Sequence, residues 1–368
     1  MPTSDEAVVV DETNSETSTD NTESRAVETP EDFVPQKVSV LKTIRLPSIT
    51  FCMASHEASG RICCGGSDFS VSMFDPAAEK PEASALSERK HESYVTGMIC
   101  HGDTIVSGSY DGSLMWWNVV SGEVTRHLPD AHGRWIRQLA LSPNGMEFAS
   151  VADDMQTKIW NMETGECRLT LGDYPLQTPH GYPSMLYTVA WSADGALLAT
   201  GDRTGQILIR SADDGRIMRT VEAPVMYTWD PKARRHSIGG VRSVAFSPDN
   251  TMLAVGGMGK VGNIDHLEGV SRIEVFRLDT GERLHEIEDS KYKGLVEVLR
   301  FSADSKWLLA GGGDHGGFVS TYQMSDGKLL AQEKIPNHVH DLILRPDHSV
   351  ITVGHEQAAV VQLERANG

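Results

Sequence analysis

The chain has 368 residues, of which 39% are hydrophobic and 23% charged, so it holds enough apolar material for one large or two ordinary globular domains. Its formal net charge of −18 disfavours a nucleic-acid binder, because such a protein needs a cationic surface. No apolar run approaches the roughly 20 residues of a membrane helix, and the first residues lack the basic and apolar regions of a secretory signal. The five cysteines lack metal-ligand spacing and are typical of reduced thiols, so we expect a cytoplasmic protein with neither a nucleic-acid nor a membrane partner.

Residues 1–36 differ in composition from the rest of the chain. They hold ten Asp or Glu residues and a single base, Arg25, which gives half of the net charge in a tenth of the length. A stretch so rich in charge, Ser and Thr buries too little apolar surface to offset its chain entropy, so we expect a disordered acidic tail. The tail is either a solubilising leader, which its composition favours, or an acidic arm that contacts a basic partner.

Residues 38–46 form the first predicted strand. The segment VLKTIRL at 40–46 resembles ECRLTLG at 166–172 and RIMRTVE at 216–222, which are the last strands of two later repeats. The final repeat of the sequence lacks such a strand of its own, because it stops at the corresponding glycine turn. We therefore expect residues 38–46 to complete the last repeat and to remove two open sheet edges.

A sequence frame recurs through the rest of the chain. It consists of V-A-F-S-P-D-G or a variant of it, an apolar run that ends in small residues, an alternating run that ends in an aromatic residue, and D-T-G-E. Clear copies lie at 135–171, 185–221 and 240–287. Each unit holds four short apolar and β-branched runs separated by turn residues, which predicts four antiparallel strands. Sheets that are apolar on both faces are not stable alone, so several must pack radially.

This frame resembles the repeat of the WD40 family over about residues 38–368. The slot at the end of the third strand of each unit is filled by Phe74, Trp117, Trp160, Arg210, Phe276, Tyr322 and Leu363. Seven slots imply seven blades. The expected fold is therefore an all-β, seven-bladed WD40-like β-propeller at residues 37–368, with a four-stranded antiparallel sheet in each blade and a ring closed by the N-terminal strand.

Two repeats carry Ser, His and Asp at matched spacing. The sets are His91, Ser107, Asp111 and Trp117 in the second unit, and His132, Ser150, Asp154 and Trp160 in the third. The resemblance to WD40 repeats implies that each set is a buried structural tetrad, in which the Ser joins the His to the indole N–H and the Asp accepts from the His. A catalytic triad would occur once and without a Trp partner, so we expect no catalytic residue here.

Three insertions, 173–184, 222–239 and 258–271, interrupt the short regular turns. In a WD40-like ring, all three connections open on the same rim, and long loops of this kind usually carry function. They contain residue types that are enriched at interfaces, namely Tyr174, Tyr182, Tyr227, Trp229, Arg234, Arg235 and His236. We expect these residues to bind a protein or peptide partner, which makes the chain a non-catalytic interaction scaffold. The alternative is that the loops only pack on one another or plug the channel.

Polar residues near the expected central channel suggest a second function. His338 and His340 flank one residue of a predicted strand, so strand alternation places both side chains on one face. With Asp314 and His315, they would serve a propeller enzyme or a binder of a small ligand or metal at the channel mouth. Two histidines do not complete a zinc site, and a third ligand would have to come from Asp314, His315 or His355. Polar channel lining is the simpler interpretation, so we expect no metal and no cofactor.

Overall fold

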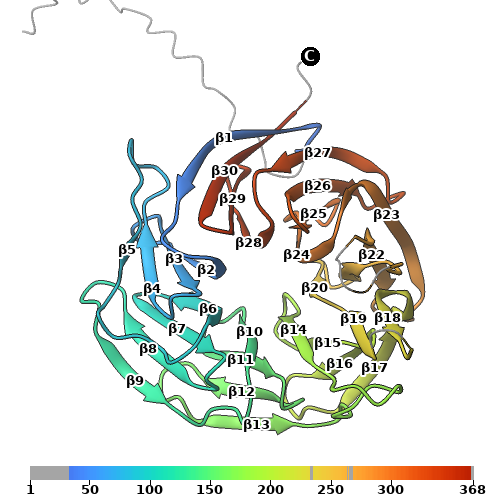
Figure 1. Cartoon of the computed structure of the whole chain (residues 1–368), viewed down its shortest axis with the longest axis horizontal. Helices are drawn as coiled ribbons and strands as arrows, with labels where there is room; N and C mark the ends of the chain where they lie inside the picture. Colours follow the sequence, from blue (N-terminus) through green and yellow to red (C-terminus); the bar gives the residue numbers. More distant parts are fainter. Residues whose placement is uncertain (1–32, 233–234, 263, 265–267, 366–368) are drawn as a thin grey trace, which may run out of the picture.

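The chain folds into seven four-stranded antiparallel sheets that stand around a central channel (Figure 1). The computed structural model describes residues 33–365, apart from 233–234, 263 and 265–267. Within each sheet, the strands are termed a to d from the channel outward. Each strand a contacts the strands a of the two neighbouring sheets, and the contact between β2 and β28 closes the circle. The predicted seven-bladed, all-β propeller is confirmed.

The first three blades follow the chain in simple a-to-d order. Blade 1 contains β2 (Thr50–His56), β3 (Arg61–Gly66), β4 (Val71–Phe74) and the short β5 (Ser84–Ala85). Blade 2 contains β6 (Val95–His101), β7 (Thr104–Ser109), β8 (Leu114–Asn118) and β9 (Val124–Leu128). Blade 3 contains β10 (Ile136–Leu141), β11 (Glu147–Ala152), β12 (Thr157–Asn161) and β13 (Cys167–Leu171).

Blades 4 to 6 repeat this order with longer connections. Blade 4 contains β14 (Leu186–Trp191), β15 (Leu197–Asp202), β16 (Gln206–Ser211) and β17 (Ile217–Glu222). Blade 5 contains β20 (Ser243–Phe246), β21 (Met252–Met258), β22 (Val270–Arg277) and β23 (Arg283–Lys293). Blade 6 contains β24 (Leu295–Phe301), β25 (Trp307–Gly313), β26 (Gly317–Gln323) and β27 (Leu329–Ile335).

Blade 7 is built from both ends of the described chain. Its strands are β28 (Val339–Leu344), β29 (Ser349–Gly354), β30 (Gln357–Glu364) and, as strand d, β1 (Lys37–Arg45). β1 pairs antiparallel with β30 along its whole length (Figure 1). The expected closure by an N-terminal strand is confirmed, and the strand begins and ends one residue earlier than the predicted 38–46.

The chain already contacts the propeller before β1. The ring of Phe33 is 9% exposed and stacks on His348 at a centroid distance of 3.6 Å. The indole N–H of Trp307 donates a hydrogen bond of 2.9 Å to the main-chain oxygen of Phe33. Of the expected acidic tail, residues 1–36, all but the last four residues lie outside the described part of the chain.

The slot at the end of strand c occupies the same register in blades 1 to 6. In each of these blades the slot residue pairs with an apolar residue of strand b, as Trp160 does with Phe148. The slot residues are buried and pack into the apolar layers between blades. The one charged exception, Arg210, is 2% exposed and forms an ion pair of 2.7 Å with Asp173. The ion pair compensates the burial of this charge.

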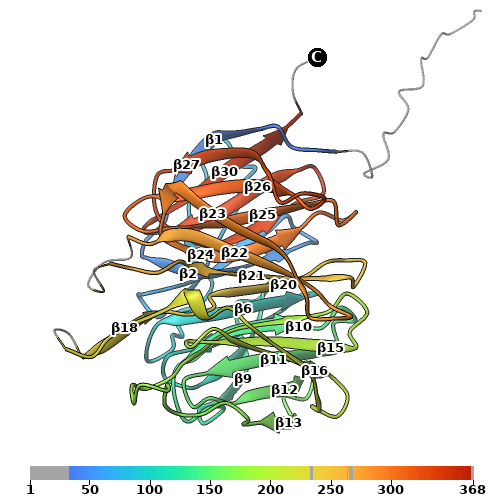
Figure 2. The same ribbon diagram turned by 90° about the vertical axis from the view of Figure 1, so that its right-hand side faces the viewer.

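The insertion at 222–239 is more regular than the sequence suggests. It contains a 3₁₀ turn (Pro224–Met226) and a two-stranded hairpin of β18 (Tyr227–Asp230) and β19 (His236–Gly239). Figure 2 shows this hairpin projecting from one face of the ring. Across the described residues, no helix is long and apolar enough to cross a membrane.

Candidate functional site

The three predicted insertions contact one another on a single rim of the ring. This rim, termed the upper rim, is formed by the d–a and b–c connections, and the a–b and c–d turns form the lower rim. The ring of His180 stacks on Trp229 at 3.7 Å and on Tyr227 at 5.6 Å, which joins the first insertion to the hairpin. The hydroxyl of Tyr182 adds a hydrogen bond of 3.1 Å to the main-chain oxygen of Asp230.

The third insertion packs against the same hairpin. The main-chain N–H of Val261 donates a hydrogen bond of 3.1 Å to the Thr228 hydroxyl. Met258, Val261 and Leu295 form a small buried cluster, against which Ile238 of β19 packs. These contacts hold the hairpin on the ring, so its exposed side chains have a fixed base.

The predicted partner-binding residues divide into four groups. Trp229 is 41% exposed, and Arg235 and His236 are exposed as well, whereas Tyr182 and Tyr227 are half-buried. Arg234 lies outside the described residues. The assignment of Tyr174 is corrected. This residue is 5% exposed, and its hydroxyl donates to the Thr200 carbonyl at 2.7 Å and accepts from the Leu208 N–H at 3.1 Å. Its aromatic ring is needed to fill the core, so it is not available to a partner.

The channel mouth is lined by one side chain from each blade. In six of the seven inner strands, the pairing with strand b shifts by one residue at the same position, and the extra residue points into the channel. Such bulges are known to re-aim side chains. With Arg242 at the same place in blade 5, the seven residues surround a cavity of about 280 Å³; they are Phe51, Thr96, Arg137, Tyr187, Arg242, Glu297 and His340.

An aromatic belt, which the sequence analysis did not identify, continues from this mouth onto the upper rim. Trp135 stacks on Tyr110 at 4.6 Å, and Tyr110 lies 5.7 Å from Tyr94. The guanidinium of Arg137 lies 4.8 Å from the Tyr110 ring and is held by two 2.7 Å hydrogen bonds to Asp153. Tyr94 is 41% and Trp135 49% exposed. Tyr94 and Trp135 both directly precede a strand a, and this shared position is the signal in the sequence from which they could have been predicted.

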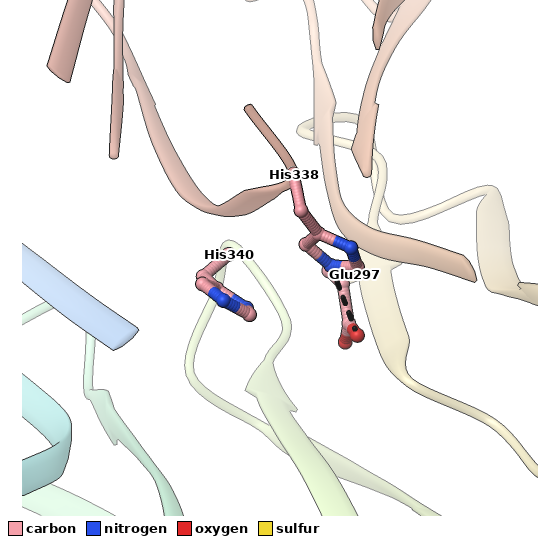
Figure 3. Close-up of side chains that lie close together, drawn as sticks. All are labelled: Glu297, His338 and His340. Carbon is pink, nitrogen blue, oxygen red and sulfur yellow. Dashed lines mark ion pairs between the residues drawn. The ribbon is translucent and has the colours of Figure 1, made fainter. Parts of the chain in front are cut away.

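On the opposite side of the mouth, Glu297, His338 and His340 point toward one another (Figure 3). Nε2 of His338 lies 3.5 Å from Oε1 of Glu297, and Nδ1 of His338 lies 3.2 Å from the Asp314 carbonyl. Burial, together with the charge of the neighbouring His338, lowers the pKa of His340 to about 3. Burial raises the pKa of Glu297, but hydrogen bonding to His338 and the charge of Arg242 outweigh this and bring it down to about 2. The carboxylate is therefore ionised and the His340 imidazole is neutral at pH 7.

The polar set predicted for the alternative function is only partly brought together. His338 and His340 face one another, with ring centroids 4.5 Å apart. The side chain of His315 is 85% exposed and pairs with the Asp314 carboxylate at 2.8 Å. Among the described contacts, Asp314 meets His338 only through its main-chain oxygen, and not through its carboxylate. The carboxylate that does face the histidines is Glu297, which the sequence analysis missed.

The structure brings the four side chains of each Ser-His-Asp-Trp set together between blades. In blade 3, Ser150 lies 2.6 Å from Nε2 of His132 and accepts from the Trp160 indole at 2.8 Å. Nδ1 of His132 lies 3.0 Å from Asp154. Burial raises the pKa of Asp154, but hydrogen bonds from His132 and two backbone N–H groups outweigh it, so the pKa is below its usual value.

The set in blade 2 has one difference. Ser107 lies 2.7 Å from Nε2 of His91 and accepts from the Trp117 indole at 2.8 Å. Nδ1 of His91 is 3.3 Å from Asp111 but 2.9 Å from the hydroxyl of Ser113. The histidine therefore has two alternative partners on this side.

Comparison with known proteins agrees with this architecture. The family described as WD40 (WD domain, G-beta repeat) matches residues 85–118, 122–161, 173–217 and 231–261. The apoptotic protease-activating factor 1 of Rattus norvegicus is 34% identical over 153 residues, which are 42% of this chain and 11% of that protein. The same factor from Homo sapiens is 30% identical over 178 residues, 48% of this chain and 13% of that protein.

A third relative is the nuclear distribution protein PAC1-2 of Uncinocarpus reesii, which is 34% identical over 96 residues, 24% of this chain and 21% of that protein. The matched part thus spans about a tenth to a fifth of these relatives. Four segments match the repeat of the family, and the ring has seven blades of four strands. The chain therefore contains WD40 repeats and forms a seven-bladed β-propeller.

Proposed function

We propose that this protein is a non-catalytic, cytoplasmic scaffold that binds a protein or peptide on its upper rim. The observation that carries the proposal is the concentration of exposed aromatic and cationic side chains on a rigid part of that rim. Trp229, Arg235 and His236 are exposed on the hairpin, and Tyr94 and Trp135 are exposed on the aromatic belt. Trp, Tyr and Arg are the residues that dominate binding energy at protein interfaces.

The comparison with the relatives also supports a binding role. The relatives are named for different roles, apoptotic protease activation and nuclear distribution, and share with this chain a segment that is a small part of each. A module reused in this way is typical of an interaction domain. The proposed partner is a peptide or protein with acidic groups beside apolar ones, because Arg235, His236 and the Arg residues of the mouth accompany the aromatic rings. Nucleic acid and membrane are not proposed as partners, given the net charge of −18.

The proposal is tested by affinity purification from the native cell, followed by mass spectrometry. One variant combines Trp229→Ala, Arg235→Ala and His236→Ala, and a second combines Tyr94→Ala and Trp135→Ala. The control combines Val120→Ser and Met146→Ser, because these side chains are 76% and 65% exposed on turns of the lower rim. We expect a specific partner to be recovered with the wild type and the control and lost with at least one upper-rim variant. Recovery of the same partner with both upper-rim variants would refute the assigned surface.

A further inference from the structure

Three potential metal ligands converge at the channel mouth between blades 6 and 7. One donor atom each of Glu297, His338 and His340 lies within 4.8 Å of the other two. The distance of 3.5 Å between Nε2 of His338 and Oε1 of Glu297 is close to the edge of a tetrahedron with metal–ligand bonds of about 2.0–2.2 Å. These two atoms need little movement to share an ion, and a change in side-chain torsions of His340 brings in the third.

The histidine nitrogens that face this point make no hydrogen bond among the described residues, although Nε2 of His338 lies 3.5 Å from the Glu297 carboxylate. His338 is 6% exposed, and in the described part of the chain neither its Nε2 nor that of His340 makes a hydrogen bond. Buried polar atoms are nearly always paired, so two unpaired imidazole nitrogens side by side call for an explanation. Nδ1–H of His338 donates to the Asp314 carbonyl, which leaves the lone pair on Nε2. A carbonyl that fixes the tautomer of a histidine in this way is typical of metal sites.

The carboxylate of Glu297 lies 3.5 Å from Nε2 of His338 and forms no ion pair with a lysine or an arginine among the described contacts. Arg242, whose charge lowers the pKa of Glu297, has its guanidinium 3.8 Å from the centre of the Tyr187 ring, and the described contacts include no ion pair between Arg242 and Glu297. A carboxylate beside two imidazole nitrogens that make no hydrogen bond is a ligand set suited to a cation. It differs from the tetrads, in which every histidine nitrogen has an oxygen partner.

We propose that Glu297, His338 and His340 bind one Zn²⁺ ion at the channel mouth. Two imidazoles and a carboxylate form a zinc ligand set, whereas Mg²⁺ and Ca²⁺ prefer oxygen ligands alone. Glu297 and His340 also line the 280 Å³ cavity, so water from the channel fills the fourth position. The site is separate from the exposed residues to which the partner is assigned, and the proposal does not depend on that function.

The test uses the full chain without an affinity tag, stripped with a chelator and kept reduced. Zn²⁺ binding is measured by isothermal titration calorimetry, and Co²⁺ is used as a spectroscopic probe of the coordination. We expect one Zn²⁺ per chain and a Co²⁺ absorption band of a four- or five-coordinate site, which Zn²⁺ displaces. Glu297→Gln and His340→Asn should each weaken binding about 100-fold or more, since loss of a mere orienting group costs about 10–100-fold.

Two control variants separate the proposed site from adventitious binding. His355 lies 5.2 Å from His340 between ring centroids but outside the ligand set, and Cys167 is the exposed thiol. His355→Asn and Cys167→Ser should leave the affinity unchanged. The melting temperature of each metal-free variant is first measured in the presence of chelator. Only variants that melt at the wild-type temperature are used in the binding measurement, so that a loss of folding is not mistaken for a loss of binding. The proposal is overturned if no stoichiometric Zn²⁺ binds, or if Glu297→Gln and His340→Asn bind as tightly as the wild type.

Discussion

Replacement of Ser150 by Ala measures what a buried tetrad contributes to the propeller. Ser150 is fully buried, and its hydroxyl is shared by Trp160 at 2.8 Å and by His132 at 2.6 Å. Alanine fits the same space, so no cavity forms. The change leaves two polar atoms without a partner at sites where Trp160 and His132 are each 5% exposed. Each unpaired buried group costs about 1–3 kcal/mol, so the loss of partners for two groups should lower the free energy of unfolding by about 2–6 kcal/mol.

The assay is urea unfolding, and the structure offers a matched control. The free energy of unfolding is the urea concentration at the midpoint multiplied by the slope m. The slope should be the same in the variant and the wild type, because both expose the same surface on unfolding. Ser237 is also fully buried, but its hydroxyl has no hydrogen-bond partner among the described residues. Ser237→Ala should therefore be neutral or slightly stabilising. Equal free energies for the two variants would show that the shared hydroxyl of Ser150 does not stabilise the fold.

Three further predictions concern the tetrads and the N-terminal segment. Asp154→Ala should lower the free energy of unfolding by about 1–3 kcal/mol, and Asp111→Ala by less, because Ser113 also reaches His91; the order is checked by urea unfolding. Phe33→Ala should cost about 2–4 kcal/mol because the ring is 9% exposed, whereas Leu41→Ala at 60% exposure should cost almost nothing; equal melting temperatures would refute the docking of Phe33. Burial lowers the pKa of His132, so below about pH 6.5 the unfolded chain takes up a proton that the folded chain does not. The free energy of unfolding therefore decreases as the pH is lowered. His132→Gln should therefore lose less stability than the wild type between pH 7 and pH 5 in urea unfolding, and a steeper loss would contradict the sign.

The ring and its closing strand followed from spacing, because packing between blades leaves little freedom. A residue at the end of strand c faces the same apolar layer in successive blades, so a large side chain recurs there once in each repeat. Even Arg210, which breaks the pattern, keeps the register. The closing strand at 38–46 was predicted because residues 40–46 resemble the last strands of two other repeats and the final repeat lacks such a strand of its own.

The candidate site was less visible, because its side chains are placed by bulges. Alternation along a strand assigns each residue to one face, and one extra residue in the inner strand breaks this rule where the channel begins. Glu297 is such an extra residue, so nothing in its local sequence distinguishes it from a solvent-facing glutamate. When the sequences of blades 6 and 7 are aligned, Glu297 occupies the same position as His340. Residues at equivalent positions of neighbouring blades lie side by side around the channel. Comparison between repeats, rather than within one, would have found it.

The same geometry explains where chemistry can vary in this protein. The six bulge residues and Arg242 line an open cavity and take no part in the layers between blades, so side chains as different as Thr96, Arg137 and Glu297 occupy equivalent positions. Replacing one of them changes the channel mouth without creating a void in the core. By contrast, Tyr174 was assigned to a partner because of its place in a long loop, yet its ring is buried beneath that loop. Residue type and loop membership indicate a binding surface only where the scaffold leaves the side chain exposed, which on this ring means the hairpin, the aromatic belt and the bulge positions.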